Sequence, residues 1–258
     1  MNKSFDLSKF KSDEGVYILS ASNKDFEKIY LQVRNKEKRV YSDEEVKRLP
    51  FASESNPHKS EWVLRAKSFQ RIKNYLQHKK GNMNILDLGC GNGWFSGQLS
   101  KSFNHNLYCI DLNFIELKQG RKNFAFENVN FVYADIFSDR LPNSFFDIVF
   151  INAAVQYFPD LKKLNTHLLS LSNEDGEIHI IDSPIYHEDD ATKAKQRTEN
   201  YYSSLGFTEM SNNYFHHTWK ELSDFNLNIF YNPNNFSAKV KKLFGVNDSP
   251  FPWIKISK

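Results

Sequence analysis

The chain has 258 residues, of which 40% are hydrophobic and 25% charged, as in a globular protein with one large domain or one domain with additions. Its formal net charge of +3 is too weak to indicate a nucleic-acid-binding protein, which usually carries a concentrated basic face. Two cysteines exclude a disulfide scaffold, and no stretch approaches the roughly 18 apolar residues of a membrane span. We therefore expect a cytoplasmic protein without a signal peptide.

The first 80 residues are predicted to form a helical extension that acts as a lid. Residues 1–24 are polar and poorly patterned, apart from an apolar run at 16–19. Helices are expected at 25–34, 42–49 and 60–79, the last from apolar side chains that recur at helical spacing. Lids of this type can control how a substrate reaches its site.

Strands and helices alternate from residue 84 onward. Strands are expected at 84–88, 107–111, 130–134, 146–151 and 177–182, and helices at 94–102, 114–125, 160–172 and 189–205. This alternation predicts a three-layer α/β fold, in which helices cover both faces of a parallel sheet. Two aromatic-rich stretches, 213–217 and 226–231, are predicted as further strands with a short helix at 218–223 between them. The core domain then spans 81–231, and 232–258 is expected to be an irregular tail that packs on it.

The most informative stretch is NILDLGCGNGWFS at residues 84–96. Three glycines, Gly89, Gly91 and Gly93, follow an apolar strand and precede a helix, so bare backbone and unpaired helical N–H groups can face a ligand. Dinucleotide-binding folds use G-x-G-x-x-G, whereas the spacing here is D-x-G-x-G-x-G. The line 87–93 closely resembles the glycine loop of class I S-adenosylmethionine-dependent methyltransferases.

This resemblance implies a Rossmann-like, seven-stranded, mostly parallel sheet with an antiparallel last strand, and S-adenosylmethionine as the cofactor. Asp111 closes the second strand, where a carboxylate can accept both ribose hydroxyls of a nucleoside. The alternative for Asp111 is the N-cap of the next helix. In the family pattern, Asp135 faces the adenine amine and Ile136 packs on the ring; otherwise they are a solvated loop acid and a core isoleucine.

The stretch FDIVFINAAVQYFPDL at 146–161 resembles the fourth-strand signature of the same family. Asn152 and Ala153 would lie beside the cofactor, and Gln156 and Tyr157 would point toward the methyl acceptor. The alternative for Tyr157 is a buried aromatic residue. The full set expected at the cofactor is Asp87, Gly89, Cys90, Gly91, Asn92, Gly93, Asp111, Leu112, Asp135, Ile136, Asn152 and Ala153.

Cations before the core offer a further contact with the cofactor that the resemblance implies. Arg65 or Lys59 could pair with its methionine carboxylate, although a solvated helix face is the plainer interpretation.

The sequence contains no obvious catalytic triad. The resemblance implies an already activated methyl group and an in-line displacement, for which the protein mainly aligns the acceptor and excludes water. The catalytic residues remain unassigned, with Tyr157, His216 and His217 as the candidates for a proton acceptor. The acids at 187–190 open a predicted helix, where the helix dipole favours them, so no metal site is expected.

We expect a methyltransferase that acts on an unidentified small-molecule acceptor. The alternatives are an RNA or tRNA methyltransferase and a cofactor-binding module without turnover; the glycine spacing disfavours a nicotinamide dehydrogenase. Residues 152–155 lack the [D/N]-P-P-[Y/F] motif of exocyclic-amine nucleic-acid methyltransferases, and no cysteine follows Cys109. The lysine run at 239–242 is short. The oligomeric state stays open.

Overall fold

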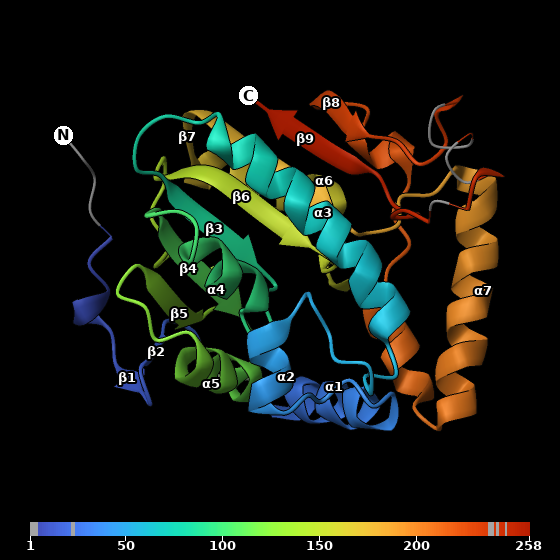
Figure 1. The fold of residues 1–258 in the computed structure, drawn as a ribbon, viewed down its shortest axis with the longest axis horizontal. Coiled ribbons are helices and arrows are strands. Elements are labelled where there is room, and N and C mark those ends of the chain that lie inside the picture. Colours follow the sequence, from blue (N-terminus) through green and yellow to red (C-terminus); the bar gives the residue numbers. More distant parts are fainter. Residues whose placement is uncertain (1–4, 22–23, 237–239, 241–242, 246) are drawn as a thin grey trace.

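Nine strands of the described residues form one mixed sheet, and helices cover both of its faces (Figure 1). The structure, a computed structural model, describes residues 5–21, 24–236, 240, 243–245 and 247–258. The strands are β1 (Ser12–Asp13), β2 (Val16–Ile18), β3 (Asn84–Leu88), β4 (Asn106–Asp111), β5 (Val129–Tyr133), β6 (Phe146–Asn152), β7 (Ser172–Ile181), β8 (Asn226–Tyr231) and β9 (Trp253–Ser257). The α-helices are α1 (Lys24–Lys36), α2 (Asp43–Arg48), α3 (Lys59–Gln77), α4 (Trp94–Ser100), α5 (Phe114–Asn123), α6 (Leu161–Leu171) and α7 (Glu188–Leu205). Short 3₁₀ turns are η1 (Leu7–Lys9), η2 (Val155–Tyr157), η3 (Thr208–Asn213) and η4 (Trp219–Leu222).

The five core strands are parallel, as the alternation of strands and helices predicts. The strand order is β1-β2-β5-β4-β3-β6-β7-β9-β8, and β2 also runs parallel to β5. The chain moves outward from β3 through β4 to β5 and then returns to the other side of β3 with β6. The strand order therefore reverses beside β3, which puts the glycine-rich stretch at the position where open α/β sheets bind ligands.

Each face of β3 contributes to a separate hydrophobic core, because side chains alternate along a strand. Ile85 packs with residues of α3, α4 and α5 on one face. Leu86 and Leu88 pack with residues of α6 on the other. All three side chains are buried, and this explains why the strand reads as an almost continuous apolar run.

The predicted mostly parallel sheet with an antiparallel last strand is confirmed in β3–β9, which are seven strands. The described residues add two edge strands at the N-terminal end, and the last strand comes from the tail instead of from 213–217. The N-terminal segment supplies β1 and β2 at the edge beside β5. The C-terminal tail supplies β9, which pairs antiparallel with both β7 and β8. These strands escape sequence reasoning because β1 and β2 are only two and three residues long and β9 follows two prolines.

A buried polar contact holds β9 in the sheet. The indole Nε1 of Trp253 donates to Nδ1 of His179 at 2.9 Å. The other ring nitrogen of His179 then carries the proton and faces Glu177 at 3.4 Å. Glu177 also accepts from Tyr75 on α3 and from Lys79 just after it, so the tail strand, β7 and α3 are joined by one network. The end of the tail is therefore part of the sheet, whereas the described residues between β8 and β9 form no strand, as expected of an irregular segment.

The aromatic stretch at 213–217 is not a strand, contrary to prediction. Asn213 ends η3, and 214–217 form a loop that leads to an isolated bridge between Thr218 and Tyr186. Aromatic residues favour strands only where a sheet edge is free to pair with them. Here Tyr214 instead packs in a small cluster with Val33, Tyr202 and Met210. The predicted short helix is confirmed as η4, and 226–231 is confirmed as β8.

Within the described ranges, no helix has the length and apolar character needed to span a bilayer. Of the lysine run at 239–242, the three lysines lie outside the described residues.

Candidate active site

A cavity of about 580 Å³ lies at the carboxyl ends of β3, β4, β5 and β6. Residues of α1, α3 and α7 form its other walls. In Figure 1 the arrows of β3 and β6 point toward the side of the molecule where α1 and α7 lie. Every residue predicted at the cofactor, except Gly93, lines this cavity. The aromatic ring of Phe131 instead occupies the space where a Cβ on Gly93 would stand.

Three neighbouring strands, β3, β6 and β7, are followed by residues in the left-handed conformation. Gly89 after β3 has φ +71°, Ala153 after β6 has φ +54° and Asp182 after β7 has φ +48°. A Cβ on Gly89 would lie 2.5 Å from the Cβ of Ala154, so the turn after β3 requires glycine for space as well as for conformation. Ala153 and Asp182 carry the strain of this region, which is typical of functional sites.

Asp111 fastens the glycine turn to the end of β4. Its Oδ2 accepts from the backbone N–H of Gly91 at 2.7 Å, and its Oδ1 accepts from that of Asn113 at 2.8 Å. Burial raises the pKa of the Asp111 carboxyl, and the backbone donors oppose that rise. Each carboxylate oxygen keeps a further lone pair for a ligand hydroxyl.

The N-cap of α5 is Asn113, so the alternative interpretation of Asp111 as that cap is wrong. The Asn113 side chain accepts from the N–H of Glu116 at 3.1 Å and donates to its carboxylate at 3.0 Å. Burial raises the pKa of Glu116 to about 7, although Arg34 opposes the shift.

A second buried carboxyl, Asp87, lies under the glycine turn. It accepts from the hydroxyl of Ser96 on α4 at 2.8 Å, which joins β3 to the helix that follows the turn. Burial, with a contribution from the charge of Asp111, raises the pKa of Asp87 to about 7. Negative charge is therefore costly beneath the glycine turn unless a cation lies nearby.

The ends of β5 and β6 contribute the remaining predicted residues. Asp135 is exposed, and its carboxylate accepts from the N–H of Phe137 at 2.9 Å, whereas the neighbouring Ile136 is buried. Asn152 lies at the carboxyl end of β6, and its buried Oδ1 has no hydrogen-bond partner. These residues, the glycine turn, Asp87 and the end of β4 form what we call the cofactor side of the cavity.

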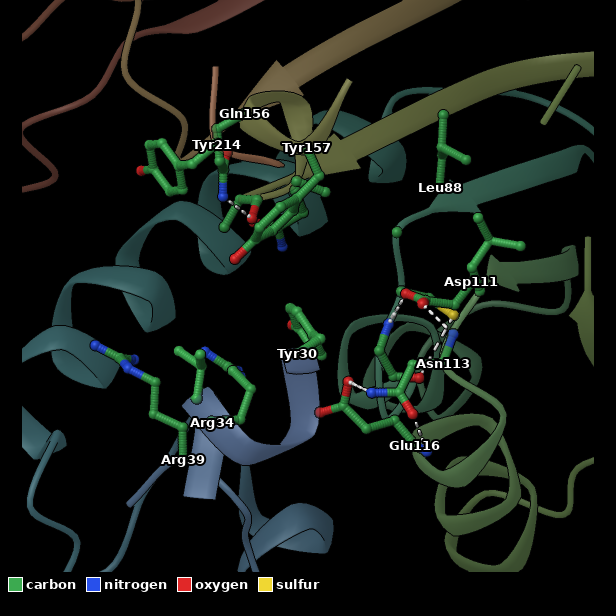
Figure 2. A pocket seen from close by; sticks show the side chains of 18 of the residues that line it. Tyr30, Arg34, Arg39, Leu88, Asp111, Asn113, Glu116, Gln156, Tyr157 and Tyr214 are labelled. Atoms are coloured by element: carbon green, nitrogen blue, oxygen red, sulfur yellow. Dashed lines mark hydrogen bonds between the residues drawn. The ribbon is translucent and has the colours of Figure 1, made fainter. Parts of the chain in front are cut away.

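The opposite wall, called here the acceptor side, consists of α1, η2, α7 and Tyr214. Tyrosine rings dominate it: the Tyr157 ring packs edge-on against Tyr30 at 5.7 Å and against Tyr214 at 5.9 Å. Figure 2 shows Asp111, Asn113 and Glu116 on one side, Tyr157 and Tyr214 on the other, and Tyr30 between the two groups. Burial raises the pKa of Tyr157, so its hydroxyl is neutral at physiological pH.

Arginines also line the cavity, and their pairing differs. Arg39 and Arg65 both donate to the carboxylate of Glu61, at 2.7 and 3.0 Å. Arg34 reaches no closer than 4.0 Å to Glu37, and its buried Nε has no hydrogen-bond partner. Of the two cations considered for the methionine carboxylate, Arg65 lines the cavity, whereas Lys59 pairs with Glu54 outside the lining.

The two histidine candidates do not line the cavity. His217 is buried between the carbonyl of Val155 at 3.2 Å and Glu221 at 3.1 Å, and it joins η2 to η4. His216 hydrogen-bonds the hydroxyl of Thr198 at 2.8 Å, so it reaches the cavity only through another side chain. Tyr157 is the one catalytic candidate whose side chain belongs to the lining.

Sequence reasoning missed the contribution of α1. Four lining residues, Glu27, Tyr30, Val33 and Arg34, recur at helical spacing and therefore share one face of this helix. That mixed aromatic and charged stripe was the available signal, because a helix that only covers a core presents an apolar stripe.

Comparison with known proteins identifies the family. The model of a methyltransferase domain family matches residues 79–228, more than half of the chain. The chain belongs to this family. This membership agrees with the S-adenosylmethionine-dependent class I methyltransferase that the glycine loop and strand-end acids predict.

Curated relatives of this methyltransferase are distant and match over part of their length. A malonyl-[acyl-carrier protein] O-methyltransferase of Ilyobacter polytropus is 29% identical over 110 residues, which cover 42% of this chain and 41% of that protein. An uncharacterized methyltransferase of Mycobacterium bovis is 28% identical over 101 residues, which cover 39% of this chain and 51% of the relative. The matches thus span about half the length of these relatives or less.

Solved methyltransferase structures share the fold. A geranyl diphosphate C-methyltransferase of Streptomyces coelicolor, crystallised with Mg²⁺, a geranyl diphosphate analogue and S-adenosylhomocysteine, superposes with a TM-score of 0.54 at 12% identity and covers 76% of each chain. The YcgJ protein of Bacillus subtilis gives a TM-score of 0.54 at 14% identity and covers 75% of this chain and 99% of its own.

The residues at this site have the chemistry that the cofactor requires. Asp111 offers carboxylate oxygens, Asn152 offers a buried oxygen without a partner, and Gly91 has no side chain that would fill the space toward Glu116. The hydroxyls and the amino group of this cofactor would each find an oxygen acceptor here, and Gly91 leaves room for it.

Proposed function

We propose that this methyltransferase transfers a methyl group to a small-molecule acceptor. The observation that carries the proposal is the cavity: its volume of about 580 Å³ lies in the range of roughly 300–1,000 Å³ typical of small-molecule sites. It extends from the glycine turn to a tyrosine-rich wall between α1 and α7. A nucleic-acid substrate would instead favour an extended basic surface, and several buried acids line this cavity.

On this proposal the cofactor side holds S-adenosylmethionine. Asp111 would accept from the ribose hydroxyls, and Asp135 from the adenine amine, with Leu112 and Ile136 packed on the ring. Asn152, Ala153 and the glycine turn would surround the amino-acid part. Arg65 is placed to meet its carboxylate, since it lines the cavity beside Trp62 at 5.0 Å from the ring. The wider set proposed here is Asp87, Gly89, Cys90, Gly91, Asn92, Asp111, Leu112, Asp135, Ile136, Asn152 and Ala153.

The cofactor supplies a methyl group on a sulfonium sulfur. The chain supplies alignment: the tyrosine wall holds the acceptor atom in line with the bond that breaks, and α1 and α7 exclude water. Such positioning contributes about 7–11 kcal/mol in favourable cases. We propose that the extension formed by residues 1–80 acts as the lid, because α1 and α3 supply lining residues.

The lining favours an acceptor that needs little help in losing a proton. Among the described residues that line the cavity there is no histidine, and burial raises the pKa values of Tyr157 and Tyr202. These hydroxyls therefore donate hydrogen bonds and do not act as bases near neutral pH. We also infer a cytoplasmic location, because both cysteines are free thiols.

The proposal is tested by following the methyl group. The protein is incubated with S-adenosylmethionine labelled on the methyl carbon and a cell extract, which is then separated into small molecules, protein and RNA. We expect label in the small-molecule fraction, insensitive to nuclease, and strongly reduced with the Asp111→Asn variant. Label in RNA or in the protein fraction would contradict the proposal.

A further inference from the structure

Three buried polar atoms without hydrogen-bond partners line the same cavity. They are Nε of Arg34, Oδ1 of Asn152 and Oε1 of Gln156. A buried polar group without a partner is costly, so such groups are rare unless a ligand or water completes them. One of the three is a donor and two are acceptors. A ligand that completes them carries one hydrogen-bond acceptor and two donors.

Arg34 presents a cation on the acceptor side. Its guanidinium lies 5.7 Å from the ring of Tyr30, which packs against Tyr157 directly after β6. Its ion pair with Glu37 spans 4.0 Å, and Glu37 also meets Arg39 at 3.6 Å. Burial raises the pKa of Glu116, and the charge of Arg34 opposes that rise. By contrast, Glu61 satisfies both Arg39 and Arg65 through short hydrogen bonds. Of Arg34, Arg39 and Arg65, Arg34 is therefore the one whose guanidinium keeps a buried N–H without an acceptor.

Gln156 presents an acceptor on the same wall. Its amide nitrogen donates to the carbonyl of Ala153 at 2.7 Å, which fixes the orientation of the amide. The oxygen is thus directed away from that contact and has no partner, and the residue is only 8% exposed. A hydroxyl or N–H group on a bound molecule would complete it.

We propose that the methyl acceptor is a small hydroxy or amino acid-type anion, with a carboxylate or phosphate bound by Arg34 and a hydroxyl or N–H group bound by Gln156. This inference rests on the proposed small-molecule function and specifies its substrate class. The tyrosine rings around both groups suit a flat or apolar body between the two polar ends. Arg34 and Gln156 determine specificity here and do not take part in proton transfer.

The competing role for Arg34 is to bind the methionine carboxylate of the cofactor. Arg65 is better placed for that role, because its aromatic partner Trp62 packs at 5.3 Å on Trp94, the first residue after the glycine turn. If Arg34 binds the methionine carboxylate, its loss weakens cofactor binding; if it binds the acceptor, its loss weakens acceptor binding. Calorimetry with S-adenosylhomocysteine and with methylthioadenosine, which lacks the amino-acid part, separates them.

The first test measures this cofactor binding in Arg34→Met and Arg65→Met. We expect Arg34→Met to change the affinity for S-adenosylhomocysteine less than twofold, and Arg65→Met to weaken it about tenfold without affecting methylthioadenosine. A selective loss of S-adenosylhomocysteine binding in Arg34→Met would overturn the assignment of Arg34 to the acceptor.

The second test titrates probes into protein saturated with S-adenosylhomocysteine. The probes are 4-hydroxybenzoate, its uncharged amide, benzoate without the hydroxyl, and 4-hydroxyphenyl phosphate. In the wild type we expect the charged hydroxy probes to bind about tenfold more tightly than the amide or benzoate. The preference between carboxylate and phosphate identifies the anion.

Variants assign these preferences to residues. Arg34→Met should abolish the preference for the acid over the amide and keep the preference for hydroxybenzoate over benzoate. Gln156→Leu should abolish the preference for the hydroxyl and keep the preference for the acid. Arg34→Lys should restore part of the anion preference, and Arg39→Met, a matched loss of a paired cation, should retain it. Equal binding of acid and amide by the wild type, or no binding of either anion, would overturn the proposal while leaving cofactor binding and small-molecule labelling intact.

Thermal unfolding gives an independent readout. Arg34→Met should abolish the stabilisation that the anionic probe confers on the protein. A lower melting temperature in Arg34→Met, with probe stabilisation retained, would assign Arg34 a structural role instead.

Discussion

The two sides of the cavity are built in different ways. The cofactor side comes from short segments that directly follow β3, β4, β5 and β6. Its shape depends largely on the backbone, through the φ angles of glycines, N–H donors and a helix cap. The acceptor side comes from side chains on α1, α7 and η2, which are far apart in sequence. A binding site formed by backbone turns can be predicted from a single sequence motif. A site formed by the faces of several helices cannot, because it depends on how those helices pack.

The largest expected effect is that of a substitution in the glycine turn of the cofactor side. Gly89→Ala adds a Cβ 2.5 Å from that of Ala154 at φ +71°. We expect a destabilisation of about 2–5 kcal/mol and loss of S-adenosylhomocysteine binding, measured by urea unfolding and calorimetry. Gly206→Ala is the matched control, since it has φ +84° but no atom within 4 Å of the added Cβ. If both variants behave alike, the packing of the turn is not what matters.

The next effect concerns pH, because Asp87 has a pKa raised by burial to about 7. Between its unfolded pKa of about 4 and its folded value, the native state holds a proton that the unfolded chain releases. Stability from this group is therefore present below about pH 4 and is lost as pH rises through 7, by up to about 4 kcal/mol. Asp87→Asn should flatten the fall in unfolding free energy over this interval.

Asp43→Asn serves as the control for that comparison. Hydrogen bonding from Lys122 lowers the pKa of Asp43 to about 2, so its contribution is constant between pH 5 and 7. Denaturant titrations across this range should show parallel curves for the wild type and Asp43→Asn. An Asp87→Asn curve parallel to the wild type would contradict a raised Asp87 pKa.

Within the cofactor side, the two strand-end acids should differ. Asp111 is held by two backbone donors and lines the cavity, whereas Asp135 is exposed. Asp111→Asn should weaken S-adenosylhomocysteine binding by about 1.5–3 kcal/mol, roughly tenfold to hundredfold, and Asp135→Asn by less. The reverse order in calorimetry would place the ribose elsewhere.

The smallest expected effect is that of Tyr157→Phe on the acceptor side. Tyr157→Phe removes one hydroxyl and keeps the ring contacts with Tyr30 and Tyr214. We expect unchanged S-adenosylhomocysteine affinity and less than about a tenfold fall in the rate of small-molecule labelling. A loss of about 10²–10⁴ would instead make Tyr157 a general base or acid.

The sequence predicts structure correctly wherever the pattern within one segment is sufficient. The five core strands, the helices between them and the cavity-lining residues Asp111, Asp135 and Asn152 follow from apolar runs that end in particular residues. The failures occurred where a partner decides the structure. Residues 253–257 form a strand because they pair with β7 and their Trp253 donates to His179. Residues 213–217 stay outside the sheet, and Tyr214 packs with Val33, Tyr202 and Met210 instead.

The acceptor side was the least predictable part for the same reason. Arg34 reads in sequence as one more surface cation of a short helix. Only the packing of α1 against Tyr157 and the tyrosines of α7 places it in a cavity without a full partner.

A crystal structure with S-adenosylhomocysteine tests the division between the two sides most directly. We predict its ribose on Asp111, its amino-acid part against the glycine turn and Arg65, and its sulfur facing Tyr157, with Arg34 and Gln156 free of contact. Electron density for the nucleoside between α1 and α7, or a methionine carboxylate on Arg34, would contradict this account.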